Sequence, residues 1–486
     1  MSIESRAIAA LKWATAAKLV VQIASWAGTL IVVRLLTPED YGLMAKVAVV
    51  STIAGAIAEL GLGAAIVRSV DIARDDLRKI YGVSLLFSVA MTLAIVAAAP
   101  LLAHMLQEPR VTYPIAVASL QVIIGSAAII PGALWHRELS FQRLSKIEMT
   151  SGVTSIAVTL LLAFLGAGVW ALVLGTLFGA IVRSAALLIF GDRVWPRFSL
   201  RGIGDYLKFG LALVGSRVSY FIVVQSDVLI GSAFLSTTEI GEYSVALQLA
   251  TLPMTKVMGM INEILMPAVA RQQGDRASVR QAVLKYIGLM SLIAFPTLWG
   301  ISAVAPELVD VLFGPIWLPS VPAITILPLV VPIRMVCGVM FTTSLALGNS
   351  KLDLRNTIIT FVLLPSGFFV GAHWGLVGLC SAWLVSVPLA YSFSVPALLR
   401  FIGIRAVDLI AECGPPAVAA GVMYAAIATL RLANDGQPAI TALFTVIAAG
   451  VVVYFVVIAI ISPRHLRTAR SFARSLVARD APKTIE

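Results

Sequence analysis

The sequence has few charged residues for its length. Lys, Arg, Asp and Glu make up 13% of the 486 residues. A soluble chain carries about a quarter of its residues charged. Hydrophobic residues reach 59%, more apolar side chain than a soluble fold could bury. The composition therefore predicts an all-α integral membrane protein.

Residues and motifs of metal, nucleotide and disulfide chemistry are also scarce. The three cysteines, Cys337, Cys380 and Cys413, lie inside apolar stretches without metal-ligand spacing, which favours packing roles. There is no G-x-x-x-x-G-K-[ST] or H-E-x-x-H sequence, and no loop is long enough for a nucleotide-binding domain. We expect no cofactor, no metal and no ATP hydrolysis. We also expect no cleavable signal peptide, because the apolar run from Ile8 is too long.

Long apolar stretches recur along the whole chain. About 20 apolar residues cross the hydrocarbon of a bilayer as a helix. The sequence predicts fourteen spans: 10–35, 42–67, 80–105, 113–135, 147–168, 170–190, 207–234, 242–268, 283–305, 319–347, 357–372, 374–398, 409–431 and 438–462. The boundary between the eleventh and twelfth is the weakest, because only "GAHWG" separates them.

Basic residues gather in every second connection. Seven alternate loops contain Arg110 as their only basic residue, whereas the others hold clusters such as Arg74, Arg78 and Lys79. Cytoplasmic loops retain Lys and Arg, so both termini are predicted to be cytoplasmic. The net charge of +11 then reflects membrane topology rather than nucleic-acid binding. The basic tail, 464–486, suits a helix lying on an anionic leaflet.

A short internal repeat links two of these connections. "LTPEDYGLMAKVAVV" after the first span is similar to "LSTTEIGEYSVALQLA" after the seventh. Leu36, Thr37, Asp40 and Gly42 align with Leu235, Ser236, Glu239 and Gly241, about 199 residues later. Two parallel repeats with the substrate between them are a known transporter plan. The repeat predicts two six-helix lobes around a central cavity, followed by two C-terminal helices.

Polar side chains inside the spans fall on narrow helical faces. Span 1 carries Thr15, Lys18, Gln22, Ser25 and Thr29 on one stripe; span 8 carries Ser244, Gln248, Thr251, Thr255 and Asn262, with Lys256 and Glu263 beside them. Such residues line a hydrated cavity or hydrogen-bond between helices. Hydroxyls alone favour packing, whereas the added Gln, Asn and Lys favour a cavity.

Depth in the membrane separates the charged side chains. Arg217 and Arg334 lie near mid-span, so each needs water, a carboxylate or an anionic ligand, and a structural ion pair stays open for both. Lys18 lies close enough to the headgroups to snorkel instead. Asp227 suits helix capping, a pair with a neighbouring lobe, or ion coupling. Glu59, like Glu263, suits a salt bridge that forms a gate, or a contact to the substrate. Lys46 lies near the outer interface, so we expect it to anchor the helix there.

Four stretches carry a resemblance to a known family. "VVRLLTPEDYGLMA", "ELGLGAAIVR", "QSDVLIGSAFLSTTEIGEYSVA" and "INEILMPAVAR" resemble the polysaccharide transporter family of Wzx-type lipid-linked oligosaccharide flippases. That family belongs to a superfamily with the multidrug/toxin extruders and the lipid II flippase. The resemblance implies lobes at 1–200 and 201–402, an additional helix pair at 403–463 and the tail at 464–486.

The resemblance also implies a cargo and a location. Members move an undecaprenyl-diphosphate-linked sugar repeat from the cytoplasmic to the periplasmic leaflet of the inner membrane, for polymerisation into exopolysaccharide, O antigen or capsule. A polysaccharide polymerase and glycosyltransferases are the expected protein partners, and H⁺ or Na⁺ is a candidate counter-ion. The expected substrate-binding residues are Arg217, Arg334, Lys18, Gln22, Lys256, Gln248 and Asn262; Asp227, Glu59 and Glu263 are the candidates for ion coupling or gating.

Three other functions fit parts of the pattern. A multidrug/cation antiporter shares the superfamily, but cationic drugs favour cavity carboxylates and the mid-span charge is mainly basic. The lipid II flippase handles the same diphosphate-undecaprenyl group. A membrane-embedded glycosyltransferase or polymerase typically needs a long outward loop or an acidic catalytic motif, and the outward loops are short. The sequence therefore favours a flippase over an enzyme.

Overall fold

The computed structural model describes residues 26–69, 72–138, 140–192, 194–199, 201–271, 275–433 and 438–479, which form helices and connections without a strand. Two compact units divide the chain: unit 1 is Met1–Gly241 and unit 2 is Glu242–Glu486. The predicted all-α class is therefore confirmed for the described residues. The division places the predicted seventh span in unit 1, whereas the lobe boundary near residue 200 stays a prediction.

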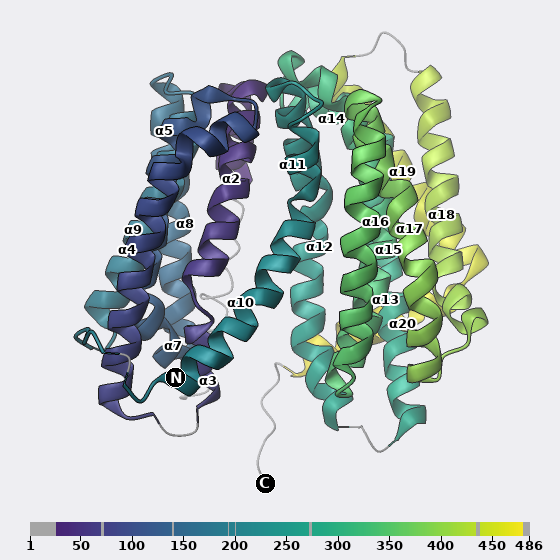
Figure 1. Ribbon diagram of the computed structural model, residues 1–486. Helices are drawn as coiled ribbons and strands as arrows, with labels where there is room; N and C mark the ends of the chain where they lie inside the picture. The colour runs from purple at the N-terminus through teal and green to yellow at the C-terminus, as the bar shows by residue number, and fades with distance from the viewer. Residues whose placement is uncertain are drawn as a thin grey trace, which may run out of the picture. The chain divides into compact units, whose positions relative to one another are not determined.

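Unit 1 consists of helices that stand side by side, with α2, α4, α8 and α9 nearly parallel (Figure 1). After a helical stretch at Trp26–Leu35, its elements are α2 (Pro38–Ala58), α3 (Leu62–Arg68), α4 (Arg74–Met105), η1 (Pro109–Val111), α5 (Thr112–Ala118), α6 (Leu120–Ala127), α7 (Ile129–Arg137), α8 (Phe141–Phe164), α9 (Val169–Phe190), α10 (Gly204–Val224) and α11 (Ser226–Gly231).

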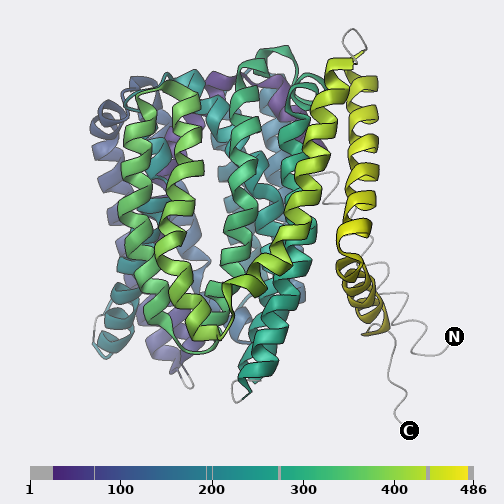
Figure 2. The same cartoon turned by 90° about the vertical axis from the view of Figure 1, so that its right-hand side faces the viewer.

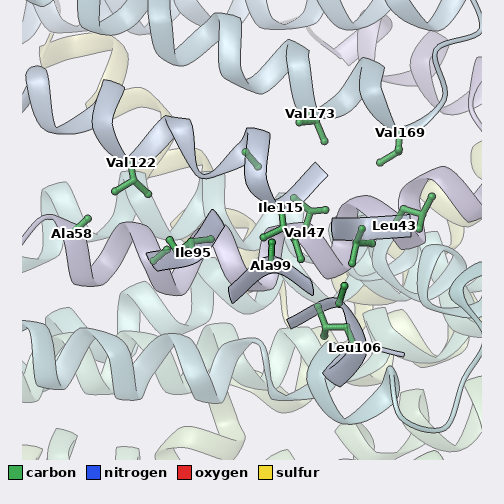
Figure 3. Packing of buried hydrophobic residues seen from close by; sticks show 14 residues of the cluster. Leu43, Val47, Ala58, Ile95, Ala99, Leu106, Ile115, Val122, Val169 and Val173 are labelled. Carbon is green, nitrogen blue, oxygen red and sulfur yellow. The ribbon is translucent and has the colours of Figure 1, made fainter. Parts of the chain in front are cut away.

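The main apolar core of unit 1 lies between α2, α4, α5, α6 and α9. Figure 3 shows Val47 of α2, Ala99 of α4 and Ile115 of α5 meeting in it. Small and branched side chains dominate this core, so the helices approach closely. Close approach is the usual basis of helix association in a bilayer, where lipid is as apolar as the side chains.

Unit 2 is built from helical hairpins. Helix α12 (Thr237–Arg271) begins in unit 1 and continues into unit 2. The remaining elements are α13 (Arg276–Ala303), α14 (Ala305–Leu312), η2 (Pro315–Ser320), α15 (Val321–Ala346), α16 (Ser350–Ala372), α17 (Gly375–Ile402), α18 (Ala406–Ala433), α19 (Ala439–Ile461) and α20 (Pro463–Arg479). Helices α16 and α17 pair along their length, as do α18 and α19 (Figure 2).

The described part of the predicted C-terminal tail forms α20, which turns away from the end of α19 (Figure 2). His465 is buried at this joint, where its Nδ1 lies 2.8 Å from the Ser462 hydroxyl and its Nε2 lies 3.2 Å from Glu412 Oε2 of α18. Leu466 packs against the apolar core of unit 2. The start of α20 is therefore fixed to the bundle, and the lipid-surface role of the tail stays a prediction.

The helices expose apolar side chains on the outside of each unit. Leu93, Leu161 and Phe444 are more than half exposed, as expected for surfaces that face lipid. Among the described residues, eleven helices are long and apolar enough to cross a membrane. Most of the predicted first span lies outside the described residues, and the seventh and eighth, on α10–α11 and α12, are not among the eleven. The total of fourteen therefore stays a prediction.

Three predicted spans are interrupted within the described residues, and the seventh is divided into α10 and α11 at Gln225. The second is divided into α2 and α3, because Leu60 and Gly61 adopt left-handed backbone angles, with φ of 48° and 59°. The fourth becomes three consecutive helices, α5 to α7. Hydropathy did not reveal these breaks, because one or two residues change the mean hydropathy of a span very little.

The two repeat elbows begin their helices with the same cap. Asp40 N donates to Thr37 Oγ1 at 3.2 Å, and Thr37 N donates to Asp40 Oδ2 at 3.0 Å. The second elbow repeats this, with Glu239 N donating to Ser236 Oγ at 3.2 Å and Ser236 N to Glu239 Oε2 at 2.9 Å. Each is a capping box, which satisfies donors at a helix start. The sequence alignment of these four residues is therefore confirmed.

The elbows also lie against each other within unit 1. A Cβ on Gly42 would collide with the Thr237 carbonyl oxygen, and a Cβ on Gly241 would collide with the Pro38 carbonyl oxygen. The crossing is reciprocal, because Thr237 stands in the repeat where Pro38 stands in the first elbow. The two aligned glycines thus allow two helix starts to cross backbone to backbone.

Candidate functional site

Two cavities lie within unit 1 and meet at one ion pair. The first, here the arginine cavity, measures about 800 Å³; the second, here the tyrosine cavity, measures about 640 Å³. Both are lined by Gly55, Glu59 and Arg217. The other polar residues of the arginine cavity are Arg68, Gln121, Ser126, His136 and Arg183, and those of the tyrosine cavity are Ser51, Thr52 and Tyr220.

The break between α2 and α3 positions the acidic partner. Glu59 is the C-cap of α2, and the left-handed turn at Leu60 and Gly61 follows it directly. A Cβ on Gly210 would collide with the Leu60 carbonyl oxygen, so the backbone of α10 lies against this turn. Two turns further along α10, Arg217 Nη1 donates to Glu59 Oε2. Residues 158 positions apart in the sequence thus form one pair.

The arginine cavity carries more positive than negative charge. Among its described lining residues, Arg68, Arg183 and Arg217 face a single carboxylate, Glu59. Arg183 also donates to Glu148 Oε1 at 2.7 Å, and Glu148 lies outside the lining. Arg217 lies at the C-terminal end of α2, where the helix dipole favours a cation. This arrangement suits an anionic ligand with several oxygens, because guanidinium groups bind phosphate in bidentate geometry.

The walls of both cavities also offer uncharged polar groups and rings. Gln121 Nε2 donates to Thr176 Oγ1 at 3.1 Å on the side of α6 and α9. In the tyrosine cavity the rings of Tyr220 and Phe221 meet edge to face, with centroids 5.5 Å apart. Ligand sites typically combine apolar and aromatic walls with a few polar groups that orient the ligand.

Arg334, the other predicted mid-span cation, lies in unit 2. Its Cζ is 4.7 Å from the centroid of the Trp383 ring, and within the described residues it meets this ring rather than a carboxylate. Trp383 is held in place because its Nε1 donates to the Tyr243 hydroxyl at 2.7 Å. A cation over an indole face is stabilised while its outer N–H groups stay available.

The remaining predicted site residues are placed less completely. Asp227 is 1% exposed within α11, where its Oδ1 accepts a hydrogen bond of 2.7 Å from Val228 N. Gln225 is the N-cap of this helix and no side chain caps it, so the role of Asp227 stays a prediction. Gln248 is exposed on α12. Lys18 and Gln22 lie outside the described residues, as do the side chains of Lys256, Asn262 and Glu263.

Four charged, titratable or amide residues of the cavities were missed by the sequence reasoning. Arg68 and His136 lie near the ends of predicted spans, where basic side chains resemble the topology signal. Arg183 lies inside the sixth predicted span, so its depth was a usable signal. Gln121 is a lone amide within an apolar stretch and stands out only once the cavity is seen.

Lys46 belongs to a buried network at the elbows, so its prediction as an interfacial anchor was wrong. The side chain is 1% exposed, and its Nζ donates to the Leu106 carbonyl and the Thr237 hydroxyl, each at 3.1 Å. Thr237 in turn donates to Glu108 Oε2 at 2.6 Å. Arg110 donates two hydrogen bonds to Glu108, of 2.8 and 2.9 Å, and also forms an ion pair with Glu39 at 2.7 Å. The network ties α2 to the start of α12.

Glu108→Gln is expected to lower the free energy of unfolding by about 1–3 kcal/mol at neutral pH, because it removes a buried charge that accepts three hydrogen bonds. Hydrogen bonds from Arg110 hold the pKa of Glu108 at about 2. A carboxyl with a lowered pKa stabilises the fold above its unfolded value, near 4.5, and loses this contribution as pH falls towards 2.

Thermal unfolding of the purified variants at several pH values tests this. The difference in Tm between the parent protein and Glu108→Gln should be constant from pH 6 to 8 and should become smaller below pH 4.5. Glu39→Gln is the matched control, because Glu39 contacts the same Arg110 at an exposed position and should contribute less than about 1 kcal/mol. Equal losses in both variants would contradict a special role for the buried carboxylate.

Comparison with known proteins gives consistent matches. The family model described as "Polysaccharide biosynthesis protein" matches residues 31–322. The succinoglycan biosynthesis transport protein ExoT of Rhizobium meliloti (strain 1021) is 26% identical over 468 residues, which cover 93% of this chain and 92% of that protein. The lipopolysaccharide biosynthesis protein WzxC of Escherichia coli (strain K12) is 23% identical over 391 residues, 79% of each chain.

Two solved structures share the fold. The lipid II flippase MurJ in an inward closed conformation aligns with a TM-score of 0.70 at 14% identity, covering 94% of this chain and 100% of that one. An inward-facing multidrug resistance MATE family transporter aligns with a TM-score of 0.61 at 17% identity, covering 77% of this chain and 94% of that one. At these identities the likeness shows the fold alone.

Proposed function

Because the chain belongs to the polysaccharide biosynthesis protein family, we propose that it is a flippase for a lipid-linked glycan. The cargo is an undecaprenyl-diphosphate-linked oligosaccharide repeat, moved from the cytoplasmic to the periplasmic leaflet of the inner membrane. There it serves exopolysaccharide, O-antigen or capsule assembly. Transport proceeds by alternating access of two lobes, and both termini are cytoplasmic.

The observation that carries this proposal is the cationic cavity. A diphosphate headgroup cannot cross hydrocarbon unaided, so a flippase needs guanidinium groups for the phosphates and polar walls for the sugars. The arginine cavity provides Arg68, Arg183 and Arg217 against one carboxylate. The named functions of two relatives, in succinoglycan transport and lipopolysaccharide biosynthesis, point to the same class of cargo.

The position of the cavity along the helices favours loading from the cytoplasm. Arg68 ends α3, His136 lies at the end of α7, and Arg183 lies in the last third of α9. These helix ends lead into connections rich in Lys and Arg, which the charge rule assigns to the cytoplasm. The lipid-linked repeat is assembled by glycosyltransferases on that side, so the cavity faces its supply.

In unit 2, Arg334 is proposed as a cargo-binding residue, with Trp383 holding its guanidinium in place. Lys18, Gln22, Lys256, Gln248 and Asn262 remain proposals for contacts to phosphate or sugar. Asp227 and Glu263 remain proposals for coupling or gating. A polysaccharide polymerase and glycosyltransferases are the proposed partners.

The pair formed by Glu59 and Arg217 gives a route for ion coupling. A diphosphate that binds Arg217 competes with the Glu59 carboxylate, and a displaced carboxylate is free to take a proton or a sodium ion. The other charged or titratable groups around this pair are Arg68, His136, Arg183 and Tyr220. Binding of cargo and uptake of a counter-ion are thus linked through one arginine.

Glu59→Gln is expected to remove the effect of a pH gradient on flipping, and to slow flipping in its presence by about tenfold. Glutamine keeps the shape of the side chain but cannot exchange a proton. The measurement is the flipping rate in proteoliposomes with and without an imposed pH gradient. Glu148→Gln is the control, since Glu148 also pairs with an arginine, Arg183, but is not itself part of the cavity lining. A variant that still responds to the gradient like the parent would exclude Glu59 as the coupling group.

Deletion of the gene tests the proposed cargo against its rivals. Loss of extracellular polysaccharide, with accumulation of the lipid-linked repeat on the cytoplasmic leaflet, is the expected phenotype. Loss of cell-wall synthesis would indicate lipid II instead. Increased sensitivity to cationic drugs with normal polysaccharide would indicate a multidrug antiporter, and sugar transfer by the purified protein would indicate an enzyme.

A further inference from the structure

A second cationic hollow lies within unit 1 and shares no residue with the two cavities. It measures about 280 Å³ and is lined by Arg74, Asp75, Arg78, Val194 and Trp195. It is formed by the first turns of α4 and by the connection that follows α9. Nothing in the proposed transport mechanism uses these residues.

The connection presents two aromatic side chains to the outside. Trp195 is 73% exposed and Phe198 is 68% exposed. A segment with water on all sides has little reason to expose two large rings. Tryptophan is enriched at the boundary between hydrocarbon and headgroups, because its ring is apolar and its N–H is polar. The start of α4, a helix long and apolar enough to cross a membrane, lines the hollow together with Trp195.

The two rings are exposed at a fixed position, because the backbone of the connection is hydrogen-bonded to α4. Arg197 N donates to the Arg78 carbonyl at 2.8 Å, and Arg78 Nε donates to the Trp195 carbonyl at 3.3 Å. Gly82 allows this contact, since a Cβ there would collide with the backbone of Arg197. The rings are therefore held at a defined place relative to the arginines.

Ion pairs neutralise the acidic residue of the hollow. Asp75 is bound by Lys79 at 2.7 Å and by Arg197 at 2.6 Å. Lys79 also contacts Asp76 at 3.2 Å. The four basic residues, Arg74, Arg78, Lys79 and Arg197, thus outnumber the two aspartates, and both Arg74 and Arg78 are exposed. The net charge of the group is positive, with Arg74 and Arg78 lining the hollow.

We propose that this hollow binds the phosphate headgroup of an anionic glycerophospholipid of the surrounding membrane. Arg74 and Arg78 contact the phosphate, and Trp195 and Phe198 insert between neighbouring headgroups. A phospholipid fits better than a free phosphate ion, because the exposed rings would gain nothing from a soluble ligand. Basic residues next to a membrane span attract anionic lipid by charge alone, and the hollow adds a fixed place for one headgroup.

Thermal stability of the purified full-length protein in detergent, titrated with lipid, tests the site. Phosphatidylglycerol is the probe, phosphatidylcholine has the phosphate without net charge, and inorganic phosphate represents the soluble source. Phosphatidylglycerol should raise the Tm more than the other two. Arg74→Gln/Arg78→Gln should weaken this effect about tenfold in lipid concentration, because two charge-assisted contacts are lost.

Two further variants make the result specific. Arg276→Gln/Arg400→Gln removes the same charge from exposed positions of unit 2 and should keep the full response to phosphatidylglycerol. Trp195→Ala leaves the side-chain ion pairs intact and should weaken the response to phosphatidylglycerol. This variant tests the proposal even if the double arginine variant does not fold. A full response in Arg74→Gln/Arg78→Gln or in Trp195→Ala would overturn the proposal. The proposal would also be overturned if Arg276→Gln/Arg400→Gln lost as much of the response to phosphatidylglycerol, or if inorganic phosphate raised the Tm as much as phosphatidylglycerol does.

Discussion

Gly42→Ala is expected to destabilise the protein by about 2–4 kcal/mol, although alanine normally stabilises a helix. The added Cβ would overlap the Thr237 carbonyl oxygen, so the two elbows must separate. Separation also breaks the hydrogen bonds that Thr237 makes with Lys46 and Glu108. The measurement is the Tm of the purified protein in detergent, together with the amount of protein in membranes.

Gly152→Ala is the matched control, because a Cβ at this position of α8 meets nothing within 4 Å. It should leave the Tm unchanged or raise it slightly. Gly241→Ala should act like Gly42→Ala, since its Cβ would overlap the Pro38 carbonyl oxygen. The double variant should be only slightly less stable than either single variant, because both changes separate the same helix crossing. A Gly42→Ala protein as stable as Gly152→Ala would contradict the crossing.

Arg217→Ala is expected to reduce surface polysaccharide at least tenfold while the protein stays at its normal level in the membrane. This side chain lines both cavities, and its loss leaves Glu59 as an unpaired negative charge where the diphosphate is proposed to bind. Loss of one charge-assisted hydrogen bond, about 1.5–3 kcal/mol, corresponds to about a tenfold or larger change in affinity. Complementation of a deletion strain, with quantified polysaccharide, measures the effect.

Arg217→Lys and Arg334→Ala refine this result. Lysine keeps the charge but not the bidentate geometry, so partial export is expected. Arg334→Ala should also reduce export, while Arg400→Ala, at an exposed position, should leave it unchanged. Normal polysaccharide in both Arg217→Ala and Arg334→Ala would show that the cations do not bind the cargo.

The sequence predicted the helical architecture and the repeat because both depend on local patterns. Apolar stretches mark helices directly, and the capping residues Thr37 and Ser236 start theirs in the same way. The breaks at Leu60 and at Ser119 were not predicted, because one residue changes the mean hydropathy of a span very little. Backbone angles at such sites depend on the neighbouring helix, as the contact of Gly210 with Leu60 shows.

The candidate site was predicted only in part, because depth in a membrane does not show which residues meet. Arg217 and Glu59 were identified separately, but their pairing depends on the packing of α10 against the end of α2. Lys46 was misjudged for the same reason: its depth suited the interface, whereas its hydrogen-bond partners Leu106 and Thr237 come from distant parts of the chain.

The flipping of a lipid-linked oligosaccharide in proteoliposomes tests the central claim most directly. The purified protein is reconstituted with an undecaprenyl-diphosphate-linked oligosaccharide, and the fraction that reaches the outer leaflet is followed over time. The expected result is flipping well above protein-free vesicles for the parent and Arg400→Ala, and near the protein-free rate for Arg217→Ala. Equal rates for the parent and Arg217→Ala, or no flipping by the parent, would contradict the account.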